Sequence, residues 1–403
     1  MTTTEKRTNL RIAAVAAFFG GLASSATQTI WQPFVLSFGL PVSMVGFLET
    51  LGSFKGIVTS LLYPISGWLA DKRGRKPIMV TGALSVTLAF GLYLLAGITG
   101  AGWLLFPGVI CLGIAFAADP AFNAFVAESA HASRRGAAFS AIMVASTTPV
   151  IFLSILGGLA VDRWGFTPIY ALTAALLGIR LILIAGGIRE TLTTVTRTGL
   201  SVPVYEVLRS LVPPKRLRGF YLATAFDSFV WGLGFHLLFA MLRVEHGFTA
   251  FQFGMMICTR ALVVALTQMP MGRIVDRYGY KAMLVASEVV GFVVLVGLLF
   301  SESFLAFVFF HALFGLSIST WVPAQLSLQA NSVPEHERGR TMGGLAAFRG
   351  LIGASGPLVG GLIYDHYGYH AAILANLVGL LVPLALFIFA VKNAPPAEEA
   401  RPG

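Results

Sequence analysis

Long apolar runs separated by short polar clusters dominate this sequence. A helix needs about 20 mostly apolar residues to cross the hydrocarbon core of a bilayer. Pro and Gly inside several runs are compatible with a membrane bundle, where neighbouring helices satisfy freed backbone groups. The pattern predicts twelve transmembrane spans, at approximately 12–38, 43–70, 78–99, 102–127, 137–160, 167–188, 219–241, 249–271, 282–300, 304–330, 341–363 and 370–391.

The positive residues between the runs predict an orientation. An even number of spans places both termini on one side, and Lys and Arg concentrate in cytoplasmic loops. The termini and the loops after the even-numbered spans hold nearly all of the loop cations, whereas Arg163 and Arg243 lie in the opposite loops. We therefore expect a protein of the cell (plasma or inner) membrane with both termini in the cytoplasm.

Composition supports a membrane protein. Hydrophobic residues make up 56% of the 403 residues and charged residues 11%, against roughly 25% charged in soluble proteins. The net charge of +10 follows from the positive loops, which do not form the single basic face that nucleic acid requires. Cys111 and Cys258 lie in apolar runs and are interpreted as packing residues rather than a disulfide framework.

Repeated motifs indicate that the chain is a tandem duplication of a six-span unit. The segment GWLADKRGRK from Gly67 recurs as GRIVDRYGYK from Gly272, and GGLAVDRWGF from Gly157 recurs as GGLIYDHYGY from Gly360. Repeats in the same order at nearly one offset indicate duplicated units. The predicted divisions are two bundles, 1–190 and 219–392, a cytoplasmic central loop, 191–218, with a short surface helix near 203–212, and a cytoplasmic tail, 393–403.

The loop GWLADKRGRKP resembles the signature loop of the major facilitator superfamily, whose pattern is roughly G-x-x-x-D-x-x-G-R-[RK]. With its degenerate second copy, the twelve spans and the central loop, the resemblance covers nearly the whole chain. It implies an all-α membrane protein of twelve transmembrane helices in two pseudo-symmetric six-helix bundles. It also implies a substrate site between the bundles near the midplane and alternating access by rocking.

The resemblance further implies that the signature loop is a cytoplasmic gate. Asp71 suits a helix N-terminus, Gly74 permits a tight turn, and Arg75 requires a carboxylate, for which Glu128 is the candidate. An ordinary positive loop is the alternative. The gate residues expected are Gly67, Asp71, Arg73, Gly74, Arg75, Glu128, Gly272, Asp276 and Gly279.

Charged residues within spans carry the prediction of a substrate. Each costs about 2.5–3.5 kcal/mol at a helix centre, so such residues usually face a bundle interior or a water-filled cavity. Lys55 and Arg260 are equivalent in the two halves, and each lies about twelve residues, roughly 18 Å, before its loop. They predict opposed cations across a central cavity, to which Arg349 adds a third.

Two explanations of these cations remain open. An anionic substrate can stabilise them, as can Asp227 or Glu49. Alternatively, the charges form internal ion pairs that hold the bundles together: Lys55 with Glu49 or Asp227, and Arg260 or Arg349 with Asp119 or Glu288. We expect proton coupling or charge balance from Asp119, Asp227 and Glu49. Arg180, His236 and His311 are interpreted as structural.

Polar and aromatic residues at helical spacing support a cavity for a small organic solute. Interhelical hydrogen bonding is the alternative for each of them. The expected substrate residues, besides Lys55, Arg260 and Arg349, are Gln28, Gln32, Asn123, Trp231, Trp321 and Gln325.

No phosphate loop, metal-ligand spacing or nucleophile elbow occurs, so we expect no enzyme, no cofactor and transport driven by a gradient. Drug/proton antiporters of the superfamily carry an acid in span 1, or an Arg in span 4 with a G-P-x-x-G-G run in span 5. Here that run begins at Gly356, in span 11. The sequence predicts a monomeric secondary transporter of a small organic solute, leaning to an anion, by proton coupling or exchange. The alternatives are proton-coupled efflux of amphiphilic or cationic compounds and a non-transporting membrane sensor.

Overall fold

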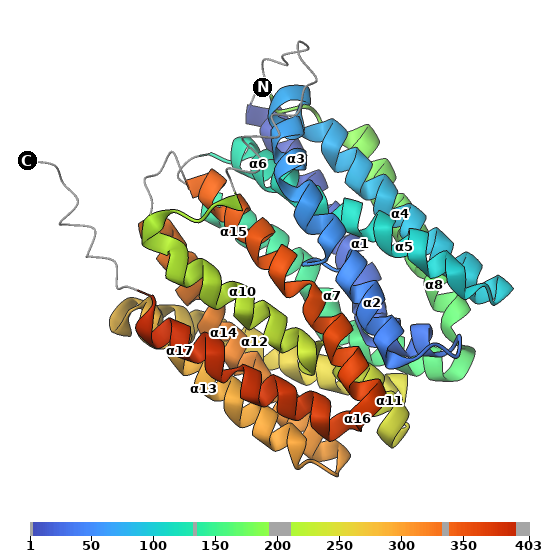
Figure 1. The fold of residues 1–403 in the computed structure, drawn as a ribbon. Helices are drawn as coiled ribbons and strands as arrows, with labels where there is room; N and C mark the ends of the chain where they lie inside the picture. Colours follow the sequence, from blue (N-terminus) through green and yellow to red (C-terminus); the bar gives the residue numbers. More distant parts are fainter. Residues whose placement is uncertain (1–2, 132–134, 193–210, 333–337, 392–403) are drawn as a thin grey trace, which may run out of the picture.

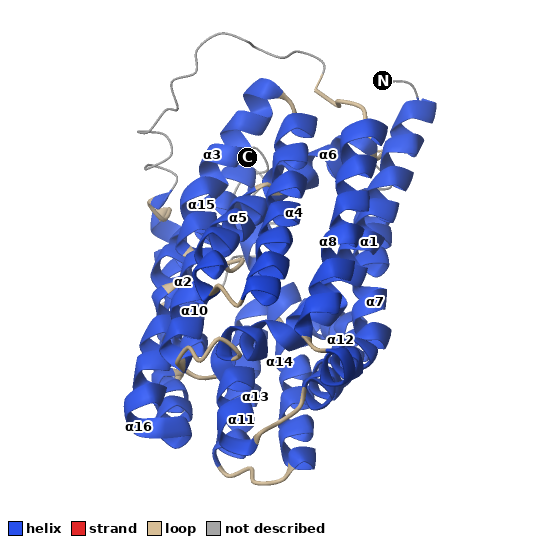
Figure 2. Ribbon diagram, turned by 90° about the vertical axis from the view of Figure 1, so that its right-hand side faces the viewer, coloured by secondary structure: helices blue, strands red, loops and turns tan. Residues whose placement is uncertain are grey.

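Helices make up almost all of the chain that the computed structural model describes, residues 3–131, 135–192, 211–332 and 338–391 (Figure 1). Figure 2 shows helices and loops, and no strand, in these ranges. Most of the surface helix expected near 203–212 and the tail 393–403 lie outside the described residues.

The first half runs from α1 to the π-helical turn η3. Its elements are α1 (Thr3–Leu36), α2 (Val42–Gly52), α3 (Ile57–Arg73), α4 (Arg75–Thr99), η1 (Gly102–Leu104), α5 (Leu105–Ala117), α6 (Asp119–Ser129), α7 (Arg135–Trp164), α8 (Phe166–Ile182) and η3 (Leu183–Gly187). Span 2 consists of α2 and α3, and span 4 consists of α5 and α6.

The second half follows a short 3-10 turn, η4 (Lys215–Leu217). Its elements are α10 (Arg218–Leu233), η5 (Phe235–Leu237), α11 (Leu238–His246), α12 (Ala250–Tyr278), α13 (Tyr280–Leu299), α14 (Phe304–Ser332), α15 (Arg338–Gly353), α16 (Ser355–Gly379) and α17 (Leu381–Phe389). Figure 1 shows the two halves as neighbouring bundles, the first in blue to green and the second in yellow-green to red.

The twelve expected spans are present. Eleven helical stretches of the described residues are long and apolar enough to cross a membrane. The last, Gly343–Phe389, has 47 residues, which at 1.5 Å per residue is about 70 Å and too long for one crossing. Gly368 interrupts it with φ 79° and ψ −174°. This stretch therefore contains spans 11 and 12.

The glycines that close the repeated motifs have matching backbone conformations. Gly74 and Gly279 end the two signature segments with φ of 106° and 84°, and Gly165 and Gly368 end the other pair with φ of 78° and 79°. Positive φ favours glycine because it lacks a Cβ atom. The chain thus turns between helices in the same way at equivalent points of both halves.

Span 2 differs from the single helix expected over 43–70. The helix stops at Gly52 and restarts at Ile57, so Lys55 lies in a non-helical break. The Thr59 hydroxyl donates to the Ser53 carbonyl at 2.8 Å, which satisfies one backbone group released by the break. Helical periodicity does not register such a break, because the flanking residues remain apolar.

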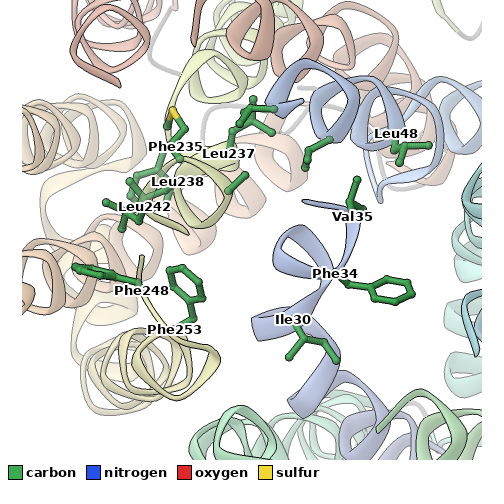
Figure 3. Packing of buried hydrophobic residues seen from close by; sticks show 14 of the residues in the cluster. Ile30, Phe34, Val35, Leu48, Phe235, Leu237, Leu238, Leu242, Phe248 and Phe253 are labelled. Atoms are coloured by element: carbon green, nitrogen blue, oxygen red, sulfur yellow. The ribbon is translucent and has the colours of Figure 1, made fainter. Parts of the chain in front are cut away.

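One hydrophobic cluster is shared by the two halves. It joins Ile30, Phe34 and Leu48 of the first half to Leu238 and Phe253 of the second (Figure 3). Two further clusters each lie within one half, at the membrane end that carries the signature loop. We call that end the loop end and the opposite one the far end. The halves therefore share a core toward the far end and have separate cores at the loop end.

Candidate functional site

A cavity of about 430 Å³ lies within the first half, lined by α1, α2, α4, α5 and α8. Aromatic rings form much of its wall, and its polar side chains include glutamines, a glutamate and an arginine. The lining includes Gln28, Trp31, Gln32, Glu49, Phe90, Tyr93, Tyr170 and Arg180. The resemblance implied a site between the bundles, whereas this cavity is built by the first half alone.

Glu49 is the acidic residue among those that line the cavity. It is half-buried on α2, and its carboxyl group is hydrogen-bonded to the Trp31 side chain. The Trp31 ring packs 4.9 Å from the Tyr93 ring, measured between centroids. A carboxylate beside aromatic faces is a suitable environment for an organic cation, through charge and cation–π attraction.

Arg180 on α8 brings a positive charge to the same cavity. Asp119, at the start of α6, attracts it electrostatically, while its buried Nε atom has no hydrogen-bond partner. The negative charge of Asp119 offsets the positive charge of Arg180. Glu49 therefore gives the cavity wall a net acidic character.

A second group of charges lies about the break in span 2. Arg349 on α15 donates to Asp227 on α10 at 3.1 Å, and both side chains are largely buried. Arg349 also donates to Gln325 at 3.2 Å, and its guanidinium carbon lies 4.4 Å from the centre of the Trp321 ring. Together with Lys55 and Glu288, these residues form what we call the charge cluster.

Lys55 joins this cluster from the first half. It lies within electrostatic range of Asp227, which attracts it, and Arg349, which repels it. Its neighbours Ser53 and Phe54 line the cavity. The break in span 2 therefore connects the cavity wall to the charge cluster.

An internal ion pair is therefore present, but between Arg349 and Asp227. The sequence had instead offered Asp119 or Glu288 as the partner of Arg349, and Lys55 as the partner of Asp227. Arg260 lies on α12, and the titratable groups in its electrostatic range are His236 and His311. The expected facing arrangement of Lys55 and Arg260 stays a prediction.

Glu288 on α13 completes the charge cluster. It is 2% exposed, its carboxyl group is hydrogen-bonded to Asp227, and its Oε2 atom has no partner. The sequence offered Glu288 as a partner for an arginine. Sequence reasoning did not anticipate two carboxyl groups side by side.

The signature loop folds against its own half. The Arg75 guanidinium donates to Glu128 Oε1 through Nε and Nη2, at 3.2 and 2.9 Å, and also binds Asp71. Glu190, at the end of span 6, accepts from the backbone N–H groups of Arg75 and Lys76 at 2.9 and 3.0 Å. The proposed Arg75–Glu128 contact is therefore formed.

At the far end, hydrogen bonds join the two halves. Asp162 and Asp365 each accept from the backbone at the start of a helix in the other half. The Gln32 amide donates to the His236 carbonyl and accepts from the Ala240 N–H group at 2.8 Å. In this conformation Gln32 therefore acts as an interhelical hydrogen bonder beside the cavity that it lines.

The remaining expected site residues are dispersed. Gln28 and Asn123 are exposed, and Gln28 lines the cavity. The Trp231 ring packs against the Phe314 ring, with 4.7 Å between the ring centroids. The Trp231 side chain is also hydrogen-bonded to Asp227. Of the other gate residues, Gly67 packs near Pro120 and Gly272 faces open space, whereas Arg73 and Asp276 are exposed.

Sequence reasoning placed Trp31 beside the polar residues of span 1 but missed the aromatic rings of α4 and α8. Trp31, Phe90, Tyr93 and Tyr170 come from three helices, α1, α4 and α8. Phe90 and Tyr93 are three residues apart, so they share one face of α4. That spacing was the one available signal, and it does not distinguish a cavity wall from an ordinary core.

Comparison with known proteins agrees with this architecture. Multidrug resistance protein MdtG of Enterobacter lignolyticus is 24% identical over 383 residues, which are 93% of this chain and 90% of the relative. Multi-drug resistance efflux pump PmrA of Streptococcus pneumoniae is 25% identical over 380 residues, 93% of this chain and 94% of the relative.

Solved transporters share the fold. The human organic anion transporter MFSD10 superposes with a TM-score of 0.70 at 18% identity, covering 95% of this chain and 99% of its own. The nucleoside transporter NupG superposes with a TM-score of 0.71 at 14% identity, covering 95% and 100%. The family profile described as Major Facilitator Superfamily matches residues 13–257 and 220–403. The chain is therefore a multi-pass membrane transporter of the Major Facilitator Superfamily and not an enzyme.

Proposed function

We propose that this protein is a proton-coupled antiporter that exports amphiphilic organic cations across the cell membrane, with its loop end in the cytoplasm. The cavity in the first half binds the solute, and Glu49 supplies the charge that selects it. The observation that carries this proposal is the position of Glu49 among aromatic rings in a cavity of about 430 Å³. Apolar pockets with a few placed polar groups are typical of small-molecule sites.

The contacts within the charge cluster support cation efflux more strongly than the sequence alone does. Arg349 is bonded to Asp227, and Lys55 is attracted to the same carboxylate. Arg349 therefore has a protein partner and does not require an anionic solute. The two relatives named for multidrug resistance also support efflux as the function of this protein.

Transport of an organic anion is the second candidate function. Arg260 favours it, because this cation lies in α12 near two histidines, and no carboxylate contact to it is seen in the described part of the chain. A cation without a neighbouring acid in a membrane bundle is a natural anion ligand.

Proteoliposomes with an imposed pH gradient test these alternatives. We expect transport of ethidium, and a Glu49→Gln variant should raise the KM for ethidium by about tenfold or more, because the charge is lost while the side-chain shape is kept. Glu302→Gln, at an exposed acid in the loop before α14, is the matched control and should transport as the unchanged protein does.

The outcomes separate the candidates. Ethidium flux that is unaffected by Glu49→Gln overturns the proposed binding site. Absence of ethidium flux, together with fluorescein flux that is abolished by Arg260→Gln, favours the anion transporter instead. Saturable ethidium binding without flux of either dye favours the membrane sensor.

A further inference from the structure

Two carboxyl groups of the charge cluster are in direct contact. Glu288 and Asp227 are hydrogen-bonded to each other, and both are buried, at 2% and 3% exposed. An ionised carboxylate accepts hydrogen bonds but cannot donate one. Such a contact therefore requires that one of the two groups carries a proton.

The contacts of the two groups differ. Arg349 donates to Asp227 at 3.1 Å, and Lys55 and the Trp231 side chain also stabilise the ionised form of Asp227. Glu288 Oε2, in contrast, has no hydrogen-bond partner. These contacts favour Asp227 as the carboxylate and Glu288 as the acid that holds the proton.

We propose that Glu288 binds and releases the coupling proton, and that Asp227 and Arg349 position it. This inference rests on the proposed function and assigns the proton site of the antiporter. Proton release converts the Glu288 carboxylic acid to a carboxylate and transfers the proton to water. Arg349, which also attracts Glu288 electrostatically, then balances the new charge.

The charges around the pair make this release feasible. Arg349 on α15 and Lys55 beside α2 and α3 are the cations that face it, and α14 contributes the neutral Gln325 and Trp321 to Arg349. With Glu288 protonated, the cluster carries one net positive charge. With Glu288 ionised, two acids balance two cations.

The break in span 2 links this change to the solute. Ser53 and Phe54 line the cavity. Lys55 is the next residue in the chain and interacts electrostatically with Asp227. A positive cluster beside the cavity repels an organic cation, whereas a neutral one does not. Binding of the cation and binding of the proton therefore oppose each other, which is the condition for antiport.

Proton release by the purified protein in weakly buffered detergent tests the assignment. Addition of ethidium should release about one proton per bound dye from the unchanged protein. Glu288→Gln should lose this release and bind ethidium about tenfold or more weakly, because the neutral amide keeps the cluster at the positive charge of the protonated state. In proteoliposomes, ethidium accumulation driven by the pH gradient should fall by about tenfold or more, while ethidium–ethidium exchange at saturating ethidium is retained.

Matched variants exclude a folding defect. Glu302→Gln should retain both proton release and accumulation, and Glu288→Asp, which keeps an acid, should retain proton release. Release and gradient-driven accumulation that persist in Glu288→Gln overturn the assignment, as does loss of exchange by a folded Glu288→Gln. Absence of ethidium exchange in the unchanged protein refutes the proposed function itself, so the two failures are distinguishable.

Discussion

Asp162 and Asp365 occupy equivalent positions of the two halves, and each accepts two backbone hydrogen bonds from the other half. Asp162 accepts from Ala250 and Phe251 at 3.0 and 2.8 Å, where α12 begins. Asp365 accepts from the backbone of residues 42 and 43 at 3.2 and 3.0 Å, where α2 begins. A carboxylate is favoured at a helix N-terminus by the unpaired N–H groups and the helix dipole.

These contacts should hold the far end closed. We expect Asp162→Asn and Asp365→Asn each to weaken the closed state by about 1 kcal/mol, a roughly fivefold shift in the equilibrium, because the amide lacks the charge that interacts with the helix start. Spin labels at Ser37→Cys and Tyr367→Cys, two exposed far-end positions in different halves, should report a larger population of long distances.

The control for this measurement is Glu302→Gln in the same labelled protein, since Glu302 is also an exposed far-end acid. Cys111→Ser and Cys258→Ser remove the native thiols from the labelling reaction. Identical distance distributions for Asp162→Asn and the control would contradict the prediction.

Gln32 and Gln28 should behave differently although they lie one helical turn apart on α1. Gln32→Ala removes both hydrogen bonds to the backbone of the second half, and buried groups left unpaired cost about 1–3 kcal/mol. We therefore expect Gln32→Ala to lower the melting temperature in detergent. Gln28→Ala, which changes an exposed side chain of the cavity wall, should leave the melting temperature unchanged; equal effects would argue against this division of roles.

Arg75 should matter for stability where Arg73 does not. Arg75→Gln leaves Glu128 and Asp71 without their shared guanidinium, and we expect a loss of about 2 kcal/mol in the free energy of unfolding. Arg73→Gln changes an exposed arginine of the same loop and should stay within about 0.5 kcal/mol. Chemical unfolding in mixed micelles measures both, and a stable Arg75→Gln protein would show that the pair contributes little.

The turn between spans 11 and 12 should require glycine. Gly368→Ala places a Cβ atom at φ 79°, which we expect to cost about 1–3 kcal/mol of stability. Gly178→Ala is the control, because this helical glycine faces open space and alanine favours a helix by up to about 1 kcal/mol. Thermal unfolding should rank Gly368→Ala below the unchanged protein and Gly178→Ala at or above it.

The sequence predicts most of the architecture, because bilayer thickness and duplication impose strong patterns. Span length identified the spans even where Gly368 joins two helices at a sharp turn. The Arg75–Glu128 contact could be predicted because an arginine in this loop needs an acidic partner, and few acids lie near that end of the membrane. These inferences depend on single-residue chemistry and on spacing along the chain.

The site depends on contacts between distant helices and was therefore less predictable. The sequence identified the charges at Lys55, Asp227, Glu288 and Arg349, but several pairings satisfied them equally. Which acid meets which base is decided by helix rotation and by the break before Ile57. Hydropathy is insensitive to both.

The reciprocal aspartates also bear on how the protein arose. In a two-fold dimer, any contact from residue i to residue j occurs twice, once in each direction. A six-span ancestor with a single aspartate at this position would form both contacts by pairing with a second copy of itself in the same membrane orientation. Fusion of two such genes would preserve the pairing, and each half would remain the natural partner of the other.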